Sequence, residues 1–215
     1  MSPYTLKWVR GEYEHNDISA LIRESYQQVY RASLSHCMPW LLGMYDASGT
    51  LRAACGVQPA SLGSLYLEQY LDAPVESILS EASGLSVMRN DIVEIGNFAA
   101  SDGASTRIMY AAICLLLNQY RFSWIVFTGT RKIRNTFFRL NLQPVTLMPA
   151  DPLRLGENAR EWGEYYQHDP QIMAGELTGG HSTLSQTSLL LPLLTHCPDA
   201  PWTATSGEQH VSEFA

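Results

Sequence analysis

Apolar positions in the first part of the chain follow helical and then strand-like spacing. Residues 17–32 carry apolar side chains three and four positions apart, as in an amphipathic helix, and Asp17 is placed to cap it. Apolar runs on both sides of residues 46–49 (Asp-Ala-Ser-Gly) predict a β-hairpin, because Asp and Gly suit a tight turn. Residues 65–71 and 74–82 have the pattern of two short helices.

The middle of the chain predicts a strand, a polar loop and a long helix. Ile92–Ala100 is apolar apart from Glu94 and Asn97, which is typical of a strand buried on both faces. A loop with one glycine follows, and then a helix from about Thr106 to Gln119. Because the first turn of a helix has unpaired N–H groups and a partial positive charge, we expect an anionic cofactor to dock at this junction.

The order of the remaining elements predicts a mixed sheet. Strands are expected at 122–128, 145–148 and 171–177, and helices at 132–140 and 159–166. A strand, a crossover helix and a second strand imply parallel pairing, whereas the hairpin implies antiparallel pairing. The expected fold is therefore of the α/β (α+β) class, with helices flanking the sheet.

Composition indicates one domain followed by a tail. The 215 residues are 46% hydrophobic, which is enough for one sizeable core, expected over residues 1–179. Residues 180–215 are rich in Ser, Thr, Pro and Gly, and predict a weakly ordered C-terminal tail that can dock on the body.

Charge and apolar run length exclude several classes of partner. The formal charge of −7 argues against nucleic acid or an anionic membrane as the main partner. The longest apolar windows, 108–117 and 189–194, are shorter than the roughly 20 residues of a membrane-spanning helix. No secretory signal is visible at the start of the chain, so a cytoplasmic location is expected.

Cysteine and histidine spacing gives no support for a metal site. Cys37, Cys55, Cys114 and Cys197 are scattered without a CxxC pair, so free buried thiols are expected. The histidines are isolated and form no HxxxH or Ser-His-Asp order.

Four segments carry a resemblance to a known family: LEQYLDAPVE, VEIGNFAA, WIVFTGTRKIRNTFFRLNLQP, and ADPLRL followed by WGEYY. Together they resemble the thermostable hemolysin family over about Tyr26 to Glu176, within the GNAT-like acyltransferase superfamily. More distantly they resemble the acyl-homoserine-lactone synthases and the N-acyl amino acid synthases. The resemblance implies a mostly antiparallel sheet with a parallel central strand pair.

The resemblance also implies an enzyme of the acyltransferase class. It would move a fatty acyl group from acyl carrier protein or a coenzyme A thioester to the amino group of an amino acid or similar small amine, in specialised-metabolite or signal biosynthesis. No tightly bound cofactor is implied, and acyl-CoA or acyl-phosphopantetheine would be the donor substrate. The lactone synthases carry a Glu-x-Ser-Arg run where this chain has residues 94–97 (Glu-Ile-Gly-Asn), so lactone formation itself is not expected.

Glu94 and Asn97 are the candidate catalytic residues. A carboxylate in a buried apolar strand should have a raised pKa and could take a proton from an attacking amine. The alternative for Glu94 is a buried ion pair with Arg89, Arg107 or Arg134. The alternative for Asn97 is a residue that sets sheet register with a satisfied amide.

Candidate donor-binding residues follow Glu94 along the chain. Backbone groups of Phe98, Ala99 and Ala100 would hold the pantetheine arm, as in GNAT enzymes. Glycine permits close backbone approach and arginine can bind a phosphate with two N–H groups, so residues 103–107 are expected to hold phosphate. In that loop the named candidates are Gly103, Ser105, Thr106 and Arg107, and Asn135 is expected beside the thiol end. The alternative for the loop is an ordinary capped helix start.

The acceptor pocket has three candidate residues. Glu68 and Tyr70 could bind an ammonium group, and Trp162 could form part of a wall. The alternatives are a surface helix with its cap, and plain aromatic packing.

A local basic cluster predicts a contact with an acidic carrier protein. It consists of Arg131, Lys132, Arg134 and Arg139, in a chain that is acidic overall. The alternative is a solvated helix face. Two other functions stay open: a membrane-active hemolysin, which should show an export signal or a long basic amphipathic segment, and a non-catalytic GNAT-like module that binds acyl carrier protein.

Overall fold

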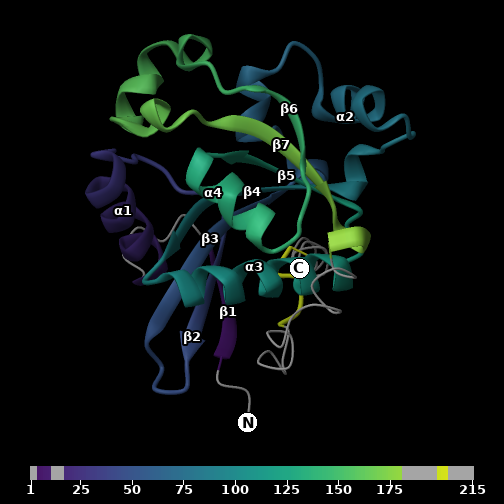
Figure 1. Cartoon of the computed structure of the whole chain (residues 1–215). Helices are drawn as coiled ribbons and strands as arrows, with labels where there is room; N and C mark the ends of the chain where they lie inside the picture. Colours follow the sequence, from purple (N-terminus) through teal and green to yellow (C-terminus); the bar gives the residue numbers. More distant parts are fainter. Residues whose placement is uncertain (1–3, 11–16, 181–197, 203–215) are drawn as a thin grey trace, which may run out of the picture.

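The computed structural model describes residues 4–10, 17–180 and 198–202. The described part contains a seven-stranded sheet in the order β1-β2-β3-β4-β5-β7-β6 (Figure 1). The strands are β1 (Tyr4–Arg10), β2 (Trp40–Asp46), β3 (Leu51–Pro59), β4 (Ile92–Ala100), β5 (Trp124–Gly129), β6 (Val145–Pro149) and β7 (Gln171–Glu176). The α-helices are α1 (Asp17–Tyr30), α2 (Val75–Ser83), α3 (Gly103–Gln119) and α4 (Arg131–Arg139).

The sheet is mixed, as the order of elements predicted. β4 and β5 pair in parallel, and every other neighbouring pair in the sheet is antiparallel. α3 supplies the crossover between β4 and β5, and a crossover of this kind is what places two consecutive strands side by side in parallel. The fold is a mostly antiparallel α/β sheet flanked by helices, with one parallel central pair.

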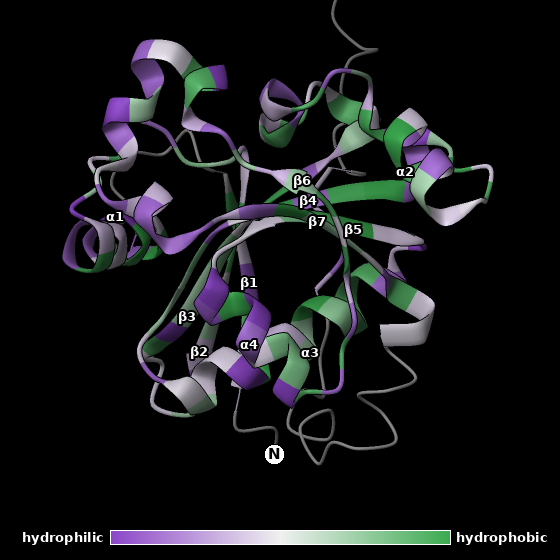
Figure 2. Ribbon diagram, turned by 45° about the horizontal axis from the view of Figure 1, so that its top comes forward, coloured by the Kyte–Doolittle hydropathy of each residue, from purple (hydrophilic) through white to green (hydrophobic). Residues whose placement is uncertain are grey.

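Helices cover both faces of the sheet. α3 and α4 lie together on one face, while α1, α2 and the 3₁₀ segments cover the other (Figure 2). Side chains alternate accordingly along the central strands: Val93 and Ile95 pack in the core under α3, and Ile92 packs in the core under α2. Glu94 shares the parity of Ile92 and so faces away from α3.

Two elements differ from the sequence expectation. β1 was not predicted, because it is an edge strand in which exposed Thr5 and Lys7 alternate with buried Leu6 and weaken its apolar signal. The helix expected at 159–166 is two 3₁₀ segments, η4 (Pro152–Trp162) and η5 (Tyr165–His168). Gly163 separates them with φ of 52°, and a side chain there would collide with the Tyr30 and Arg31 carbonyls.

The described part of the C-terminal tail packs on the body. The Trp202 ring lies 5.5 Å from the rings of Trp8 and Tyr120, and the Tyr120 hydroxyl donates to the Pro198 carbonyl. The weakly ordered tail predicted for 180–215 otherwise falls almost wholly outside the described residues.

Candidate active site

The parallel strands β4 and β5 separate near their C-terminal ends. Their pairing runs from Ile92 opposite Trp124 to Ile95 opposite Phe127 and then stops. Beyond that point β4 continues against β3, and β5 continues against β7. The backbone of β4 from Gly96 onward therefore has no strand partner on its β5 side.

Two cavities flank the point of separation. The first, the α3 cavity, has a volume of about 440 Å³, and its walls include Phe98, Tyr110, Ile113, Ile125, Phe127 and Phe137. The second, the Glu94 cavity, has a volume of about 630 Å³, and its walls include Gln58, Tyr66, Tyr70, Glu94, Asn97 and Trp162. Both are lined by Tyr26, Ile95, Gly96 and Thr128, so they meet where the strands part.

Glu94 is a buried carboxylate in the wall of its cavity. Its side chain is held by two backbone donors: Tyr66 N–H to Oε2 at 2.6 Å and Leu67 N–H to Oε1 at 3.0 Å. Burial raises the pKa of Glu94 to about 8, and the two N–H donors oppose that rise. Near neutral pH this group can exchange a proton, which is the property required of a general base.

The arginines considered as ion-pair partners for Glu94 bind elsewhere. Arg89 Nη1 lies 2.7 Å from Glu68 and 2.8 Å from Glu76, and Arg134 Nη2 lies 2.5 Å from Asp169. Arg107 is exposed on α3, on the opposite face of the sheet. Among the described residues no ion pair neutralises Glu94, so the buried-ion-pair alternative is wrong.

Arg89 instead fixes the segment that holds Glu94. Its Nε donates to the Ala60 carbonyl at 2.8 Å, and its Nη2 donates to the Gly63 carbonyl at 2.9 Å. The same guanidinium binds Glu68 within η2 (Tyr66–Tyr70). Because η2 supplies the N–H groups of residues 66 and 67, Arg89 positions the donors that face Glu94.

Asn97 forms a bulge in β4. One residue of β3, Cys55, faces two of β4, and Asn97 takes φ of 49°, a conformation that asparagine tolerates better than most residues. Its Oδ1 accepts the Met38 N–H at 2.8 Å. The contacts thus give Asn97 a satisfied amide at a register shift, as in the alternative considered for it, although it also lines the Glu94 cavity.

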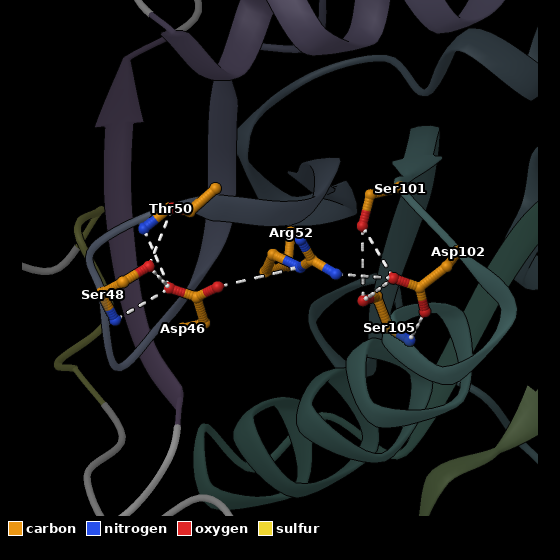
Figure 3. A network of polar contacts seen from close by, with 7 residues as sticks. All are labelled: Asp46, Ser48, Thr50, Arg52, Ser101, Asp102 and Ser105. Atoms are coloured by element: carbon orange, nitrogen blue, oxygen red, sulfur yellow. Dashed lines mark hydrogen bonds and ion pairs between the residues drawn. The ribbon is translucent and has the colours of Figure 1, made fainter.

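The start of α3 is occupied by its own cap. Asp102 accepts hydrogen bonds from the Ser105 N–H at 2.8 Å and from the Ser105 hydroxyl at 3.0 Å, and Thr106 Oγ1 donates to the Asp102 carbonyl. Arg52, at the hairpin, lies 2.9 Å from the same carboxylate (Figure 3). The hydrogen bonds from Ser105, followed by the one from the Ser101 hydroxyl, hold the pKa of Asp102 well below its usual range.

This network is evidence against the predicted phosphate loop. A carboxylate already takes the helix N-terminal donors and would repel a phosphate placed there. Gly103 and Arg107 are exposed and, like Ser105 and Thr106, line neither cavity. The arrangement is the capped helix start that stood as the alternative.

The other predicted donor-binding residues divide into two groups. Phe98 lines the α3 cavity with its ring centroid 4.7 Å from that of Tyr110, and Ala99 and Ala100 continue β4 beyond its pairing with β5. Asn135 is exposed and lines neither cavity, because α4 turns Ile133 and Phe137 inward instead.

The predicted acceptor residues also divide. Glu68 is bound to Arg89 and also accepts hydrogen bonds from the N–H groups of Leu65 and Val75. The bond to Arg89 and, after it, these two N–H groups lower the pKa of Glu68 to about 2. Glu68 lines neither cavity, and its side chain caps the start of η2. Tyr70 and Trp162 do line the Glu94 cavity, with their polar atoms bonded to Tyr166 and Tyr66.

The basic cluster is smaller than the sequence indicated. Arg134 is partly buried, and its Nη1 donates to the carbonyls of Gly129 and Asp169, so it ties the start of α4 to the body. Arg131, Lys132 and Arg139 are exposed on α4.

Sequence reasoning missed three residues of the Glu94 cavity. Gln58 is the cross-strand neighbour of Glu94, Met38 packs over Gly56 and Gly96, and Tyr26 lines both cavities. Only the register of β3 against β4 could have identified Gln58. In the sequence, Pro59 directly after it indicates the end of a strand and gives no sign of which residue lies opposite. Tyr26 was assigned only to the apolar face of its helix.

Other sequence expectations concern absences. Cys37, Cys55 and Cys114 are free thiols, and Cys197 lies outside the described residues. Within the described ranges, no three acidic, histidine or cysteine side chains gather as metal ligands would. None of the helices described has the length and apolar character to cross a membrane.

Comparisons with known proteins give one family match and several structures with a similar fold. Residues 9–181 match the family described as thermostable hemolysin. The fold is similar to the AHL synthase LasI, with a TM-score of 0.54 and 12% identity over 82% of this chain and 91% of that chain. It is similar to FeeM, an N-acyl amino acid synthase from uncultured soil microbes, with a TM-score of 0.54 and 12% identity over 85% of this chain and 96% of that chain.

A third similar structure is BjaI, a CoA-dependent acyl-homoserine lactone synthase solved with SAM and isopentyl-CoA. The TM-score is 0.54, with 11% identity over 94% of this chain and 98% of that chain. At these identities the likeness shows a fold shared with these synthases. No match was found among curated protein sequences.

Proposed function

The chain belongs to the thermostable hemolysin family, and we propose that it is an N-acyltransferase. It would move a fatty acyl group from acyl carrier protein or a coenzyme A thioester to the amino group of an amino acid or similar small amine. The observation that carries this proposal is Glu94: a buried carboxylate with a pKa of about 8 and no ion-pair partner among the described residues, in the wall of one cavity and next to Ile95, which lines both.

The α3 cavity suits the acyl donor. Its walls are mainly aromatic and aliphatic, and its volume of about 440 Å³ is in the range of small-molecule sites. The unpaired edge of β4 after Ile95 offers backbone groups to the amides of a pantetheine arm. BjaI, which shares the fold, was solved with isopentyl-CoA, and this agrees with a donor that carries coenzyme A.

The Glu94 cavity suits the acceptor, because it holds the candidate base. An ammonium group would lose a proton to the Glu94 carboxylate, and the freed nitrogen lone pair would attack the thioester carbonyl carbon. The new C–N bond forms as the C–S bond breaks, and the proton held by Glu94 passes to the thiolate. The regenerated carboxylate then takes a second proton from the nitrogen, which becomes the neutral amide, and releases it to solvent. An ammonium and a thioester thus give an amide, a thiol and one released proton, and Glu94 ends as a carboxylate.

The two backbone donors give Glu94 a defined orientation. Each carboxylate oxygen accepts one N–H and keeps lone-pair capacity for a substrate proton. In the same position the carboxylate can also anchor the incoming ammonium before the proton leaves.

Acyl transfer can be tested directly. Purified protein is incubated with fatty acyl thioesters of carrier protein and of coenzyme A, together with a panel of amino acids and amines, and acyl amides are followed by mass spectrometry. Glu94→Gln should lower kcat by about 10² to 10⁴, because the base is lost while the shape is kept. Glu81→Gln, at an exposed position on α2, is the matched control and should be unchanged.

The membrane-active alternative makes the opposite prediction. It requires the protein alone to lyse lipid vesicles, with no acyl amide formed from any donor. That pair of results would refute the acyltransferase proposal.

A further inference from the structure

The Glu94 cavity has a charge balance that is poorly suited to an amino acid. Among its described lining residues Glu94 is the one acidic side chain, and lysine and arginine are absent. The segments 11–16 and 181–197, which lie outside the described part, contain no lysine or arginine either. His36, at an exposed position of the wall, is the single histidine among the described lining residues.

Three described basic side chains on neighbouring elements do not enter the cavity. Arg89 and Arg134 are engaged with carboxylates of their own. The charge of Arg23 on α1 acts on the Cys37 thiol, whose pKa burial raises and Arg23 partly lowers, but Arg23 does not line the cavity.

The wall beside Glu94 holds an acceptor without a partner. Gln58 and Glu94 are direct cross-strand partners, so their side chains lie on the same face about 5 Å apart at Cβ. Gln58 Nε2 donates to the Pro59 carbonyl at 3.2 Å, while the buried Oε1 has no hydrogen-bond partner. Gln58 Oε1 and the remaining lone pairs of Glu94 can accept further N–H groups, which an ammonium supplies.

Aromatic rings form part of the remaining wall. The rings of Tyr66 and Trp162 lie 5.6 Å apart, and the Trp162 Nε1 donates to the Tyr66 hydroxyl at 2.9 Å. Tyr70 continues the same wall. Aromatic faces attract cations and pack well against apolar bodies.

We propose that the Glu94 cavity receives a primary amine with no carboxylate beside its amino group, such as an alkylamine or arylalkylamine. The inference rests on the proposed acyl transfer and narrows its acceptor. A carboxylate on the carbon next to the nitrogen would lie close to Glu94, with no lysine or arginine among the described lining residues to offset the repulsion. An amine without that group avoids this repulsion and can use the acceptors and aromatic rings of the cavity.

Direct binding to the unmodified protein tests this without any acyl donor. The probes are 2-phenylethylamine, L-phenylalanine and 2-phenylethanol, titrated by calorimetry at pH 8.5. The amine should bind at least about tenfold more tightly than either of the other two, a difference of about 1.4 kcal/mol. L-phenylalanine binding as tightly as the amine would overturn the inference.

Substitution of Glu94 tests whether its carboxylate causes the preference for the amine. Glu94→Gln should remove most of the advantage of the amine over the alcohol, whereas Glu81→Gln should leave it unchanged. An amine preference that survives in folded Glu94→Gln, checked by circular dichroism, contradicts the assigned role. The three-probe comparison on the unmodified protein stands even where the variant does not fold.

Turnover separates this inference from the proposed function. Amine binding as expected, with no acyl amide formed from any thioester, would refute acyl transfer and leave the amine site. Acylation of L-phenylalanine in preference to 2-phenylethylamine would refute the amine site and leave acyl transfer.

Discussion

The Tyr66 N–H donates a 2.6 Å hydrogen bond to Oε2 of Glu94 and so joins η2 to the central strand of the sheet. The two residues are 28 positions apart in the chain. This contact helps to keep a carboxylate inside an apolar strand without a cation, because the dipole of the backbone N–H offsets part of the free-energy cost of burying the charge.

The pKa of Glu94 predicts a specific pH dependence of stability. Because burial raises it from 4.5 to about 8, the native state holds one more proton than the unfolded chain between these values. The free energy of unfolding should therefore fall as pH rises from 5 to 8, by up to about 1.4 kcal/mol per pH unit.

Urea denaturation at pH 5.5, 6.5 and 7.5 measures this slope, and Glu94→Gln should flatten it because the amide does not titrate. The lowered pKa of Glu68 and of Asp102 adds no slope here, since both groups and their unfolded forms are ionised throughout this range. An unchanged slope in Glu94→Gln would contradict the assignment.

Arg89→Met should destabilise the protein by about 2 to 4 kcal/mol, because Glu68 and Glu76 would be left without their cation and the 60–63 carbonyls without their donors. Activity should fall further than stability accounts for, since η2 would no longer hold its N–H groups against Glu94.

The matched control for Arg89 is Arg154→Met, which breaks the exposed 2.7 Å pair with Asp72. A surface pair of this kind contributes less than about 1 kcal/mol. Equal losses in the two variants, measured by urea denaturation, would show that Arg89 is an ordinary surface charge.

Asn97→Gly should cost about 1 kcal/mol, because glycine keeps the positive φ and only the hydrogen bond to the Met38 N–H is lost. Asn97→Ala should cost about 1 kcal/mol more, because a Cβ without a compensating contact disfavours that conformation. If Asn97 only positions the Met38 segment, kcat of the glycine variant stays within about tenfold of the parent; a loss of 10² or more would make it a catalytic group.

Gln58→Met should leave the stability unchanged or raise it by about 1 kcal/mol, because it removes a buried acceptor that has no partner. The same change should weaken binding of 2-phenylethylamine. Gln28→Met, at an exposed position of α1 that lines neither cavity, is the comparison and should alter neither quantity appreciably. Clear destabilisation of Gln58→Met, seen as a lower thermal midpoint, would indicate a structural role.

Charge reversal on α4 tests the proposed carrier-protein contact. Lys132→Glu with Arg139→Glu should lower kcat/KM for acyl carrier protein thioesters by about tenfold or more at low salt, and less at high salt. A short acyl-pantetheine donor should be unaffected. Arg121→Glu, exposed after the end of α3, controls for net charge; equal losses there would remove α4 as the docking face.

The sequence by itself determined most of the local elements and singled out Glu94 as the candidate site residue. Strand and helix spacing gave β4, α3 and β5, and hence the parallel pair, because periodicity and a crossover connection are local properties. A carboxylate in an apolar strand also marked Glu94 before any contact was known.

Only the tertiary structure decided which partners those residues have. Arg89 binds Glu68 and Glu76, Arg52 binds Asp102, and Gln58 lies beside Glu94. Charge and hydrogen-bond pairing act between atoms a few ångströms apart, and segments distant in sequence reach that separation only through strand register and helix packing.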